Sequence, residues 1–218
     1  MASGKAVLNA IHGNLVFRRR VHVLAEVLTK TLREGKILDV GAGDGSISAR
    51  IMQRRSDIDI QGIDVLVRSN TLIPVTPFDG DHLPFANESF DCVMFVDVLH
   101  HTTDPAGLVS EAVRVAKSHV VIKDHLLQGT LAGPTLRFMD WVGNRGHDVA
   151  LPYNYLQRGT WHEIFDSAGL DIEIWSERLG LYSAPAAWLF ERSLHFVTRL
   201  RKRRRTDDKS PILKLRPE

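Results

Sequence analysis

The stretch Ile37–Ser46 reads ILDVGAGDGS and places three glycines directly after a short apolar run. Glycine weakens regular structure, so its repeated use after a strand is typical of a turn where a ligand must approach the backbone closely. A strand, a glycine-rich turn and a helix offer that ligand backbone N–H groups and a helix N-terminus. Dinucleotide sites place the third glycine three positions after the second. Gly45 follows Gly43 by two positions, and this spacing favours another ligand.

A carboxylate follows the next apolar segment. Asp64 closes the stretch IDIQGID, 23 residues beyond Gly41, where the second strand of such a unit is expected to end. Its two acceptor oxygens suit it to bind the two hydroxyls of a ribose. A solvated loop aspartate is the alternative interpretation, and the spacing favours the ligand.

A third signal lies in Phe78–His101, FDGDHLPFANESFDCVMFVDVLHH. Together with ILDVGAGDGS and GID, this stretch resembles the class I S-adenosylmethionine-dependent methyltransferases, of the small-molecule type with an LPF…SFD…VLHH signature. The resemblance covers residues 36–123 and implies S-adenosyl-L-methionine as the cofactor. Strand and helix signals also alternate over this range, which favours an α/β fold. We therefore predict a Rossmann-like, doubly wound sheet, mostly parallel with an antiparallel last strand, and helices on both faces.

The resemblance implies a cofactor site made of Asp39, Gly41, Gly43, Asp64, Val65, Asp79, Gly80 and Val96. The first three and the backbone of Val96 would hold the methionine end, and Asp64 would bind the ribose hydroxyls. Asp79, with Gly80 beside the ring, would accept a hydrogen bond from the adenine amino group, and Asp81 is the rival for that role. The family often has a bulky residue in place of Val65, so adenine packing is weaker here or comes from elsewhere.

Two adjacent histidines are the candidate catalytic residues. Methyl transfer from a sulfonium is an in-line displacement with a neutral leaving group, so the enzyme mainly aligns acceptor and methyl group. An oxygen or nitrogen acceptor that carries a proton also benefits from a general base. His100 and His101 follow the predicted fourth strand, at the carboxyl edge where open α/β sheets bind ligands. Either could instead fix the loop, an alternative that weighs more for His101. Asp124 and His125, after the fifth strand, are weaker candidates.

Residues 126–158 form an insertion with loose periodicity, several glycines and clustered aromatic side chains, which predicts a segment that covers the substrate. Trp141, Tyr153 and Tyr155 are the candidate substrate residues, because such side chains stack on or enclose an apolar acceptor. The alternative is that they fill the core beneath the loop. The sequence has no Cys/His cluster and no HExxH spacing, so it predicts no metal site.

The bulk composition fits one intracellular domain. Hydrophobic residues make up 44% of the 218 residues and charged residues 25%, so we expect a packed core. The single cysteine, Cys92, excludes an internal disulfide framework, and no signal-peptide pattern is evident, so we expect a cytoplasmic protein. We predict one methyltransferase domain over residues 1–200, with residues 1–35 as an N-terminal helical cap and residues 201–218 as a basic, disordered tail.

The tail leaves several partners open. Residues 199–218 hold nine Lys/Arg against three Asp/Glu, although the whole chain has a formal net charge of only +2. A solvated end is the simplest interpretation, but such a run could also contact an anionic membrane or a nucleic acid. The leading functional prediction is methyl transfer to a small, partly apolar acceptor of the lipid, quinone or secondary-metabolite type. An RNA methyltransferase and a non-catalytic cofactor-binding scaffold are the alternatives.

Overall fold

The computed structural model describes residues 4–143, 153–184 and 186–203, and its centre is a seven-stranded sheet of order β3-β2-β1-β4-β5-β7-β6. The strands are β1 (Gly35–Val40), β2 (Ile58–Asp64), β3 (Val75–Pro77), β4 (Phe90–Val96), β5 (Ala116–His125), β6 (Leu170–Ser176) and β7 (His195–Lys202). The first five strands pair in parallel, and β7 pairs antiparallel with both β5 and β6. This topology confirms the predicted doubly wound sheet with an antiparallel last strand.

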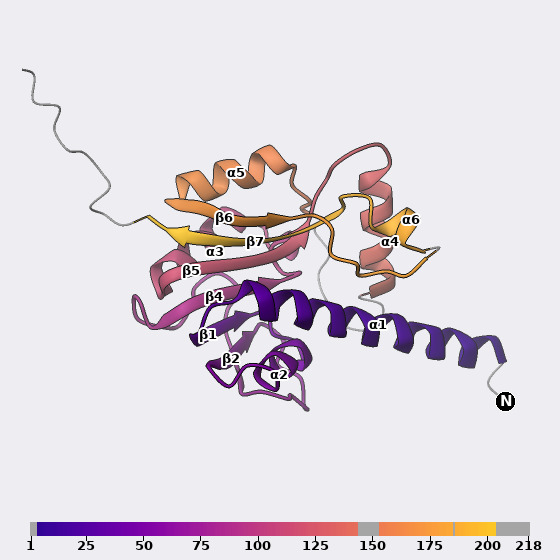
Figure 1. Ribbon diagram of the computed structural model, residues 1–218, viewed down its shortest axis with the longest axis horizontal. Coiled ribbons are helices and arrows are strands. Elements are labelled where there is room, and N and C mark those ends of the chain that lie inside the picture. The colour runs from indigo at the N-terminus through magenta and orange to yellow at the C-terminus, as the bar shows by residue number, and fades with distance from the viewer. Residues whose placement is uncertain (1–3, 144–152, 185, 204–218) are drawn as a thin grey trace, which may run out of the picture.

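Helices cover both faces of the sheet. The helices are α1 (Gly4–Thr31), α2 (Ser46–Met52), the 3₁₀ turn η1 (Leu99–His101), α3 (Pro105–Val115), α4 (Ala132–Gly143), α5 (Arg158–Ser167) and α6 (Ala186–Phe190). Figure 1 shows α1, in indigo, lying across the strands. α3 and α5 pack on the other face, because their buried side chains share a core cluster that is separate from the one under α1. α4 and α6 lie together at the end toward which the N-terminal part of α1 extends. In the ranges that the structure describes, none of these helices combines the length and apolar character that a membrane span requires.

Successive side chains of each strand point to opposite faces of the sheet, so the hydrophobic core consists of two clusters, one on each face. On β4, Val93 and Phe95 join the cluster that contains α3 and α5, whereas Cys92 and Met94 join the cluster under α1 and α2. Successive side chains of a strand point to opposite faces, so a strand that is apolar throughout must be covered on both. This requirement explains why the central strands read as continuous apolar runs in the sequence.

The segment that leads from β4 to β5 begins a helix where the sequence predicts one. The side chain of Asp104 caps α3 by accepting a hydrogen bond from the Gly107 amide at 2.8 Å, and Pro105 is the first helical residue. A proline is tolerated there because its missing N–H would have no partner within the helix. The cap therefore fixes where the loop after β4 ends and holds that loop at the carboxyl edge of the sheet.

The C-terminal part corrects two sequence predictions. The insertion over residues 126–158 is predicted to be irregular, yet it contains α4, which buries Leu136 against Tyr155 and Leu194, and residues 144–152 lie outside the described residues. The predicted start of the tail at residue 201 is wrong, because Arg201 and Lys202 pair with β6 as part of β7. Backbone pairing with a neighbouring strand outweighs the charge of this run. Residues 204–218 lie outside the described residues.

Candidate functional site

The glycine-rich turn joins β1 to α2 at the carboxyl edge of the sheet. Gly41 and Gly43 have φ angles of +75° and +59°, a left-handed region that costs other residues energy. A Cβ atom on Gly41 would collide with a methyl group of Val98, which belongs to the loop after β4. The glycine thus lets two loops from neighbouring strands lie in contact, and their backbones form one wall of a cleft.

Asp64 braces this turn from the end of β2. Its carboxylate accepts hydrogen bonds from the amides of Gly43, at 2.8 Å, and Leu66, at 2.9 Å. Two acceptor oxygens, each with remaining lone pairs, still allow it to receive hydroxyl donors. Asp64 therefore lies at the end of β2 and shapes the glycine turn, and its role at a ribose stays a prediction.

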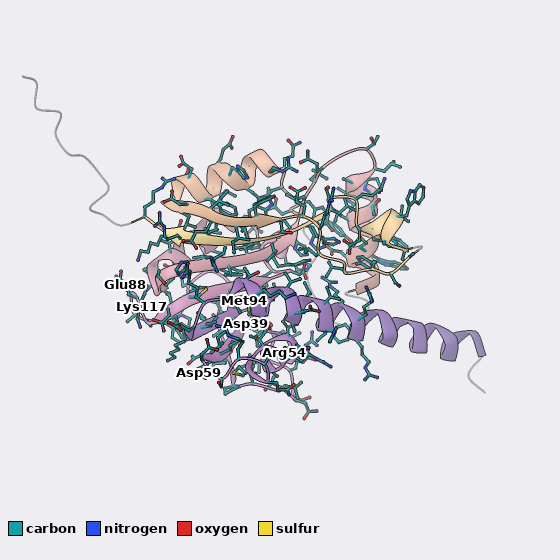
Figure 2. All side chains as sticks on the ribbon, viewed as in Figure 1. Asp39, Arg54, Asp59, Glu88, Met94 and Lys117 are labelled. Carbon is teal, nitrogen blue, oxygen red and sulfur yellow. The ribbon has the colours of Figure 1, made fainter. Side chains whose placement is uncertain are left out.

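Asp39 is buried under the turn, and its carboxylate is hydrogen-bonded to another side chain of the protein. Its carboxylate accepts a hydrogen bond from Ser48 Oγ of α2 at 2.5 Å. Burial raises the pKa of Asp39 to about 6; the Ser48 hydrogen bond opposes this shift and the charge of Asp64 adds to it. Figure 2 shows Asp39 well separated from Glu88 and Lys117, which lie together at the far end of the sheet.

A cleft of about 230 Å³ opens beside the turn. Gly41, Asp64, Val65 and Gly80 of the predicted cofactor set line it, together with Asp81, Val98, His101, Phe78 and Leu108. The structure thus gathers residues from the ends of β1, β2, β3 and β4 around one cavity. The sequence prediction missed Val98, Phe78 and Leu108, since an apolar residue near a strand end or on a helix carries the same signal as an ordinary core position.

The predicted adenine acceptor, Asp79, lies beside the cleft in a turn of its own. Its Oδ1 accepts hydrogen bonds from the amides of Asp81, at 2.9 Å, and His82, at 2.7 Å, and these bonds lower the pKa of Asp79. Asp81 is among the residues that line the cleft. The turn brings both carboxylates close to the cavity, and the choice between them stays open. Val96 ends β4 and is half-buried, with its backbone toward the same edge.

The two candidate catalytic histidines have opposite environments. His100 is 1% exposed, with Nδ1 at 2.6 Å from Asp124 Oδ1 and Nε2 at 3.5 Å from Asp140 Oδ2. Burial disfavours its charged form, but the two carboxylates outweigh burial and raise the pKa of His100 to about 10. Both ring nitrogens of His100 are therefore turned toward carboxylates inside the protein.

His101, in contrast, lines the cleft. Burial and the nearby charge of His100 lower the pKa of His101, so the neutral ring is favoured. Its Nδ1 atom has no hydrogen-bond partner among the described residues. Of the two histidines, His101 is the one placed to meet a bound molecule.

The three predicted substrate residues are not brought together at this cleft. Tyr155 is 8% exposed, and its hydroxyl donates a short hydrogen bond to Asp140. Tyr153 is half-buried beneath the guanidinium of Arg137, which lies 5.5 Å from its ring centre. Trp141 is 51% exposed on the outer side of α4. The tyrosines thus support the interior of the insertion, and the tryptophan faces outward.

Comparison with known proteins identifies the family. A family model described as a methyltransferase domain matches residues 14–173. Dimethylglycine N-methyltransferase of Parasynechococcus marenigrum (strain WH8102) is 26% identical over 177 residues, which cover 73% of this chain and 60% of the relative. Methyltransferase GfsG of Streptomyces halstedii is 31% identical over 111 residues, which cover 44% of this chain and 40% of the relative. The chain therefore spans 60% or less of the length of these two relatives.

Solved structures share the fold. A methyltransferase in complex with the Haloferax volcanii Trm112 methyltransferase activator superposes with a TM-score of 0.65 and 16% identity, covering 89% of this chain and 94% of that one. An S-adenosylmethionine-dependent methyltransferase from Mesorhizobium loti gives a TM-score of 0.59 and 17% identity, covering 81% and 96%. The family model spans most of the chain, and the glycine turn and Asp64 meet at one cleft of a sheet with this topology. The chain belongs to the methyltransferase domain family.

Proposed function

We propose that the chain transfers the methyl group of S-adenosylmethionine to an oxygen or nitrogen atom of a small, partly apolar acceptor, with His101 as the general base. The observation that carries this proposal is the position of His101 on the same cleft as Gly41 and Asp64. A base there faces the region where the cofactor and an acceptor would meet. The cofactor supplies an electrophilic methyl group.

The residues around the cleft fit the cofactor. The turn at Gly41 and Gly43 offers close backbone approach, and Asp64 offers acceptor oxygens to hydroxyl groups. A Cβ atom on Gly80 would lie 3.3 Å from a methyl group of Val65, so the absence of a side chain at this glycine keeps the cleft wall open there. Phe78 and Leu108 supply apolar walls. Asp39 and the backbone of Val96 would hold the methionine end.

The proposed chemistry asks little of the protein beyond alignment and one proton transfer. As the acceptor atom bonds to the methyl carbon, the bond from that carbon to sulfur breaks, and the sulfur leaves without charge. His101 takes the proton that the acceptor loses. The relative from P. marenigrum is named for N-methylation of dimethylglycine. A tertiary amine of that kind has no N–H to lose in its reactive neutral form, so a dependence on His101 is expected only for primary or secondary amines and for hydroxyl acceptors.

The test uses methyl-labelled cofactor with a panel of small amines, phenols, quinols and lipids. We expect label transfer to one of these classes. His101→Gln should lower kcat by about 100-fold, the usual contribution of a general base, with the cofactor Kd unchanged. His162→Gln, on the exposed side of α5, is the matched control. Transfer of label to RNA alone would replace this proposal with the RNA alternative, and cofactor binding without any transfer would favour the scaffold.

A further inference from the structure

We infer that His100, His125 and Asp140 form a binding site for one divalent transition-metal ion of the zinc class, next to the cofactor cleft. Each side chain offers one ligand atom, and the three atoms lie within 4.8 Å of one another. All three residues are buried. The inference does not depend on the proposed acceptor, because binding of the ion can be measured without turnover.

The spacing of two of the ligand atoms is that of metal ligands. His100 Nε2 and Asp140 Oδ2 are 3.5 Å apart, which is within the range of an ion pair but beyond the 2.7–3.2 Å of an ordinary N–H···O hydrogen bond. Two atoms bound tetrahedrally to one zinc ion, each at about 2.0–2.1 Å, are separated by about 3.4 Å. An ion between these two atoms would therefore need little rearrangement of either side chain.

Supporting hydrogen bonds hold the ligands in position. Asp124 accepts a hydrogen bond from His100 Nδ1 at 2.6 Å, which turns Nε2 of the same ring toward Asp140. The hydroxyl of Tyr155 donates to Oδ2 of Asp140. A carboxylate behind a histidine ligand and a donor behind a carboxylate ligand are the usual partners that orient metal-binding side chains.

The charges around the cluster also favour a cation. Arg20 and Lys123 both pair with Asp97. Asp124, among the described residues, forms ion pairs only with His100 and His125. The strongly basic side chains nearby are thus committed to another carboxylate. Without an ion, the positive charge that Asp124 faces is the protonated ring of His100, and a dication bound at Nε2 would take the place of the proton on that nitrogen.

The two nitrogens and one oxygen indicate the class of ion. Imidazole together with carboxylate suits Zn²⁺, Fe²⁺ or Co²⁺ better than Mg²⁺ or Ca²⁺, which prefer oxygen ligands alone. The ring of His100 lies 4.0 Å from that of His101, centre to centre, so the ion would lie directly behind the cleft wall. The sequence motifs predict no metal site because the ligands come from three separate segments, after β4, at the end of β5 and on α4.

The test begins with the wild-type chain after dialysis against a chelator. We expect calorimetric titration with Zn²⁺ to show one equivalent bound, and titration with Co²⁺ to produce visible d–d absorption with the same stoichiometry. His125→Gln and Asp140→Asn should each weaken Zn²⁺ binding at least tenfold. His119→Gln, at the other end of β5, should bind as the wild type does.

Each outcome decides the inference. If the wild-type chain binds neither ion near one equivalent, the cluster is a closed hydrogen-bond network and the inference is wrong. Unchanged binding in folded His125→Gln or Asp140→Asn, judged by circular dichroism, would also overturn it by placing the ion elsewhere. Should one variant fail to fold, the other variant and the Co²⁺ spectrum of the wild type still decide.

Discussion

Asp39 lies one residue before the end of β1, under the glycine turn, and its burial predicts that the cofactor site responds to pH. Burial raises the pKa of Asp39 from 3.8 to about 6 in the folded chain, so the folded state binds an extra proton between these values. Ionisation of Asp39 therefore costs stability as the pH rises through this range. A bound ammonium group would offset this cost, because it favours the ionised carboxylate.

We expect the affinity for S-adenosylhomocysteine, the product form of the cofactor, to rise about tenfold between pH 5 and pH 7, which is the change in the ionised fraction of a group with a pKa near 6. Asp39→Asn should have weaker affinity at pH 7 and a flat profile over the same range. Calorimetry at several pH values measures both. A wild-type profile as flat as that of the variant would show that Asp39 serves only the turn and Ser48.

Asp64 carries a second residue-level prediction. Asp64→Ala should weaken cofactor binding by about 1.5–3 kcal/mol, the scale of a hydrogen bond to a charged group. The same change also removes the acceptor of the Gly43 amide, which adds to the loss. Asp59→Ala, on an exposed position of the same strand and labelled in Figure 2, is the matched control. Equal dissociation constants for the two variants would exclude a ribose role.

At the scale of elements, the loops after β1, β2, β3 and β4 build the cleft. Behind it lies a polar cluster from the segment after β4, the end of β5 and α4, which consists of His100, Asp124, His125 and Asp140. The parallel strands bring their carboxyl ends to one edge, which is where open α/β sheets place ligands. The glycine turn and Asp64 could be predicted because each follows its strand immediately. Their meeting then follows from the topology alone.

The polar cluster could not be predicted in the same way. His100 follows β4, Asp124 lies inside β5 and not after it as the sequence predicts, and Asp140 lies on α4, a helix that the sequence does not indicate clearly. Glycines and a proline near the start of this helix obscure its apolar stripe, and packing of Leu136 against Tyr155 and Leu194 stabilises it. Tertiary contacts of this kind outweigh local propensity, which is a weak guide over one short helix.

Tyr155 connects α4 to the rest of the cluster, and this contact gives an element-level prediction. Tyr155→Phe removes the hydroxyl that donates to buried Asp140, so the free energy of unfolding should fall by about 1–3 kcal/mol. Chemical denaturation of the purified chain measures the change. Tyr153→Phe, where the neighbouring ring is only half-buried, should change stability less. If the two variants are equally stable, the Tyr155–Asp140 contact does not hold α4 in place.

At the scale of the whole molecule, the cations at the end of the sheet opposite the cleft are largely compensated. Lys117 pairs with Asp91, and Lys202 pairs with Glu88. Arg203 pairs with Asp166 and Asp171. Ion pairs of this exposed kind contribute little stability each. They do reduce the positive field that the first residues of the basic run would otherwise present to phosphate groups.

The basic residues up to Arg203 are thus paired with carboxylates as part of the fold, and two truncations test whether they act separately from residues 204–218. Ending the chain after Arg203 keeps β7, its ion pairs and the hydrogen bond from the Arg203 amide to Gly169. We expect that truncation to leave the thermal midpoint, and any binding to anionic vesicles or RNA, nearly unchanged. Ending the chain after Leu200 removes the pairing of Arg201 and Lys202 with β6, together with the hydrogen bond from the Arg203 amide to Gly169, and should lower the thermal midpoint by several degrees. If the truncation after Arg203 already abolishes binding to vesicles or RNA, residues 204–218 contact an anionic partner. Whether vesicle binding or RNA binding is lost would then decide between a membrane-bound acceptor and RNA.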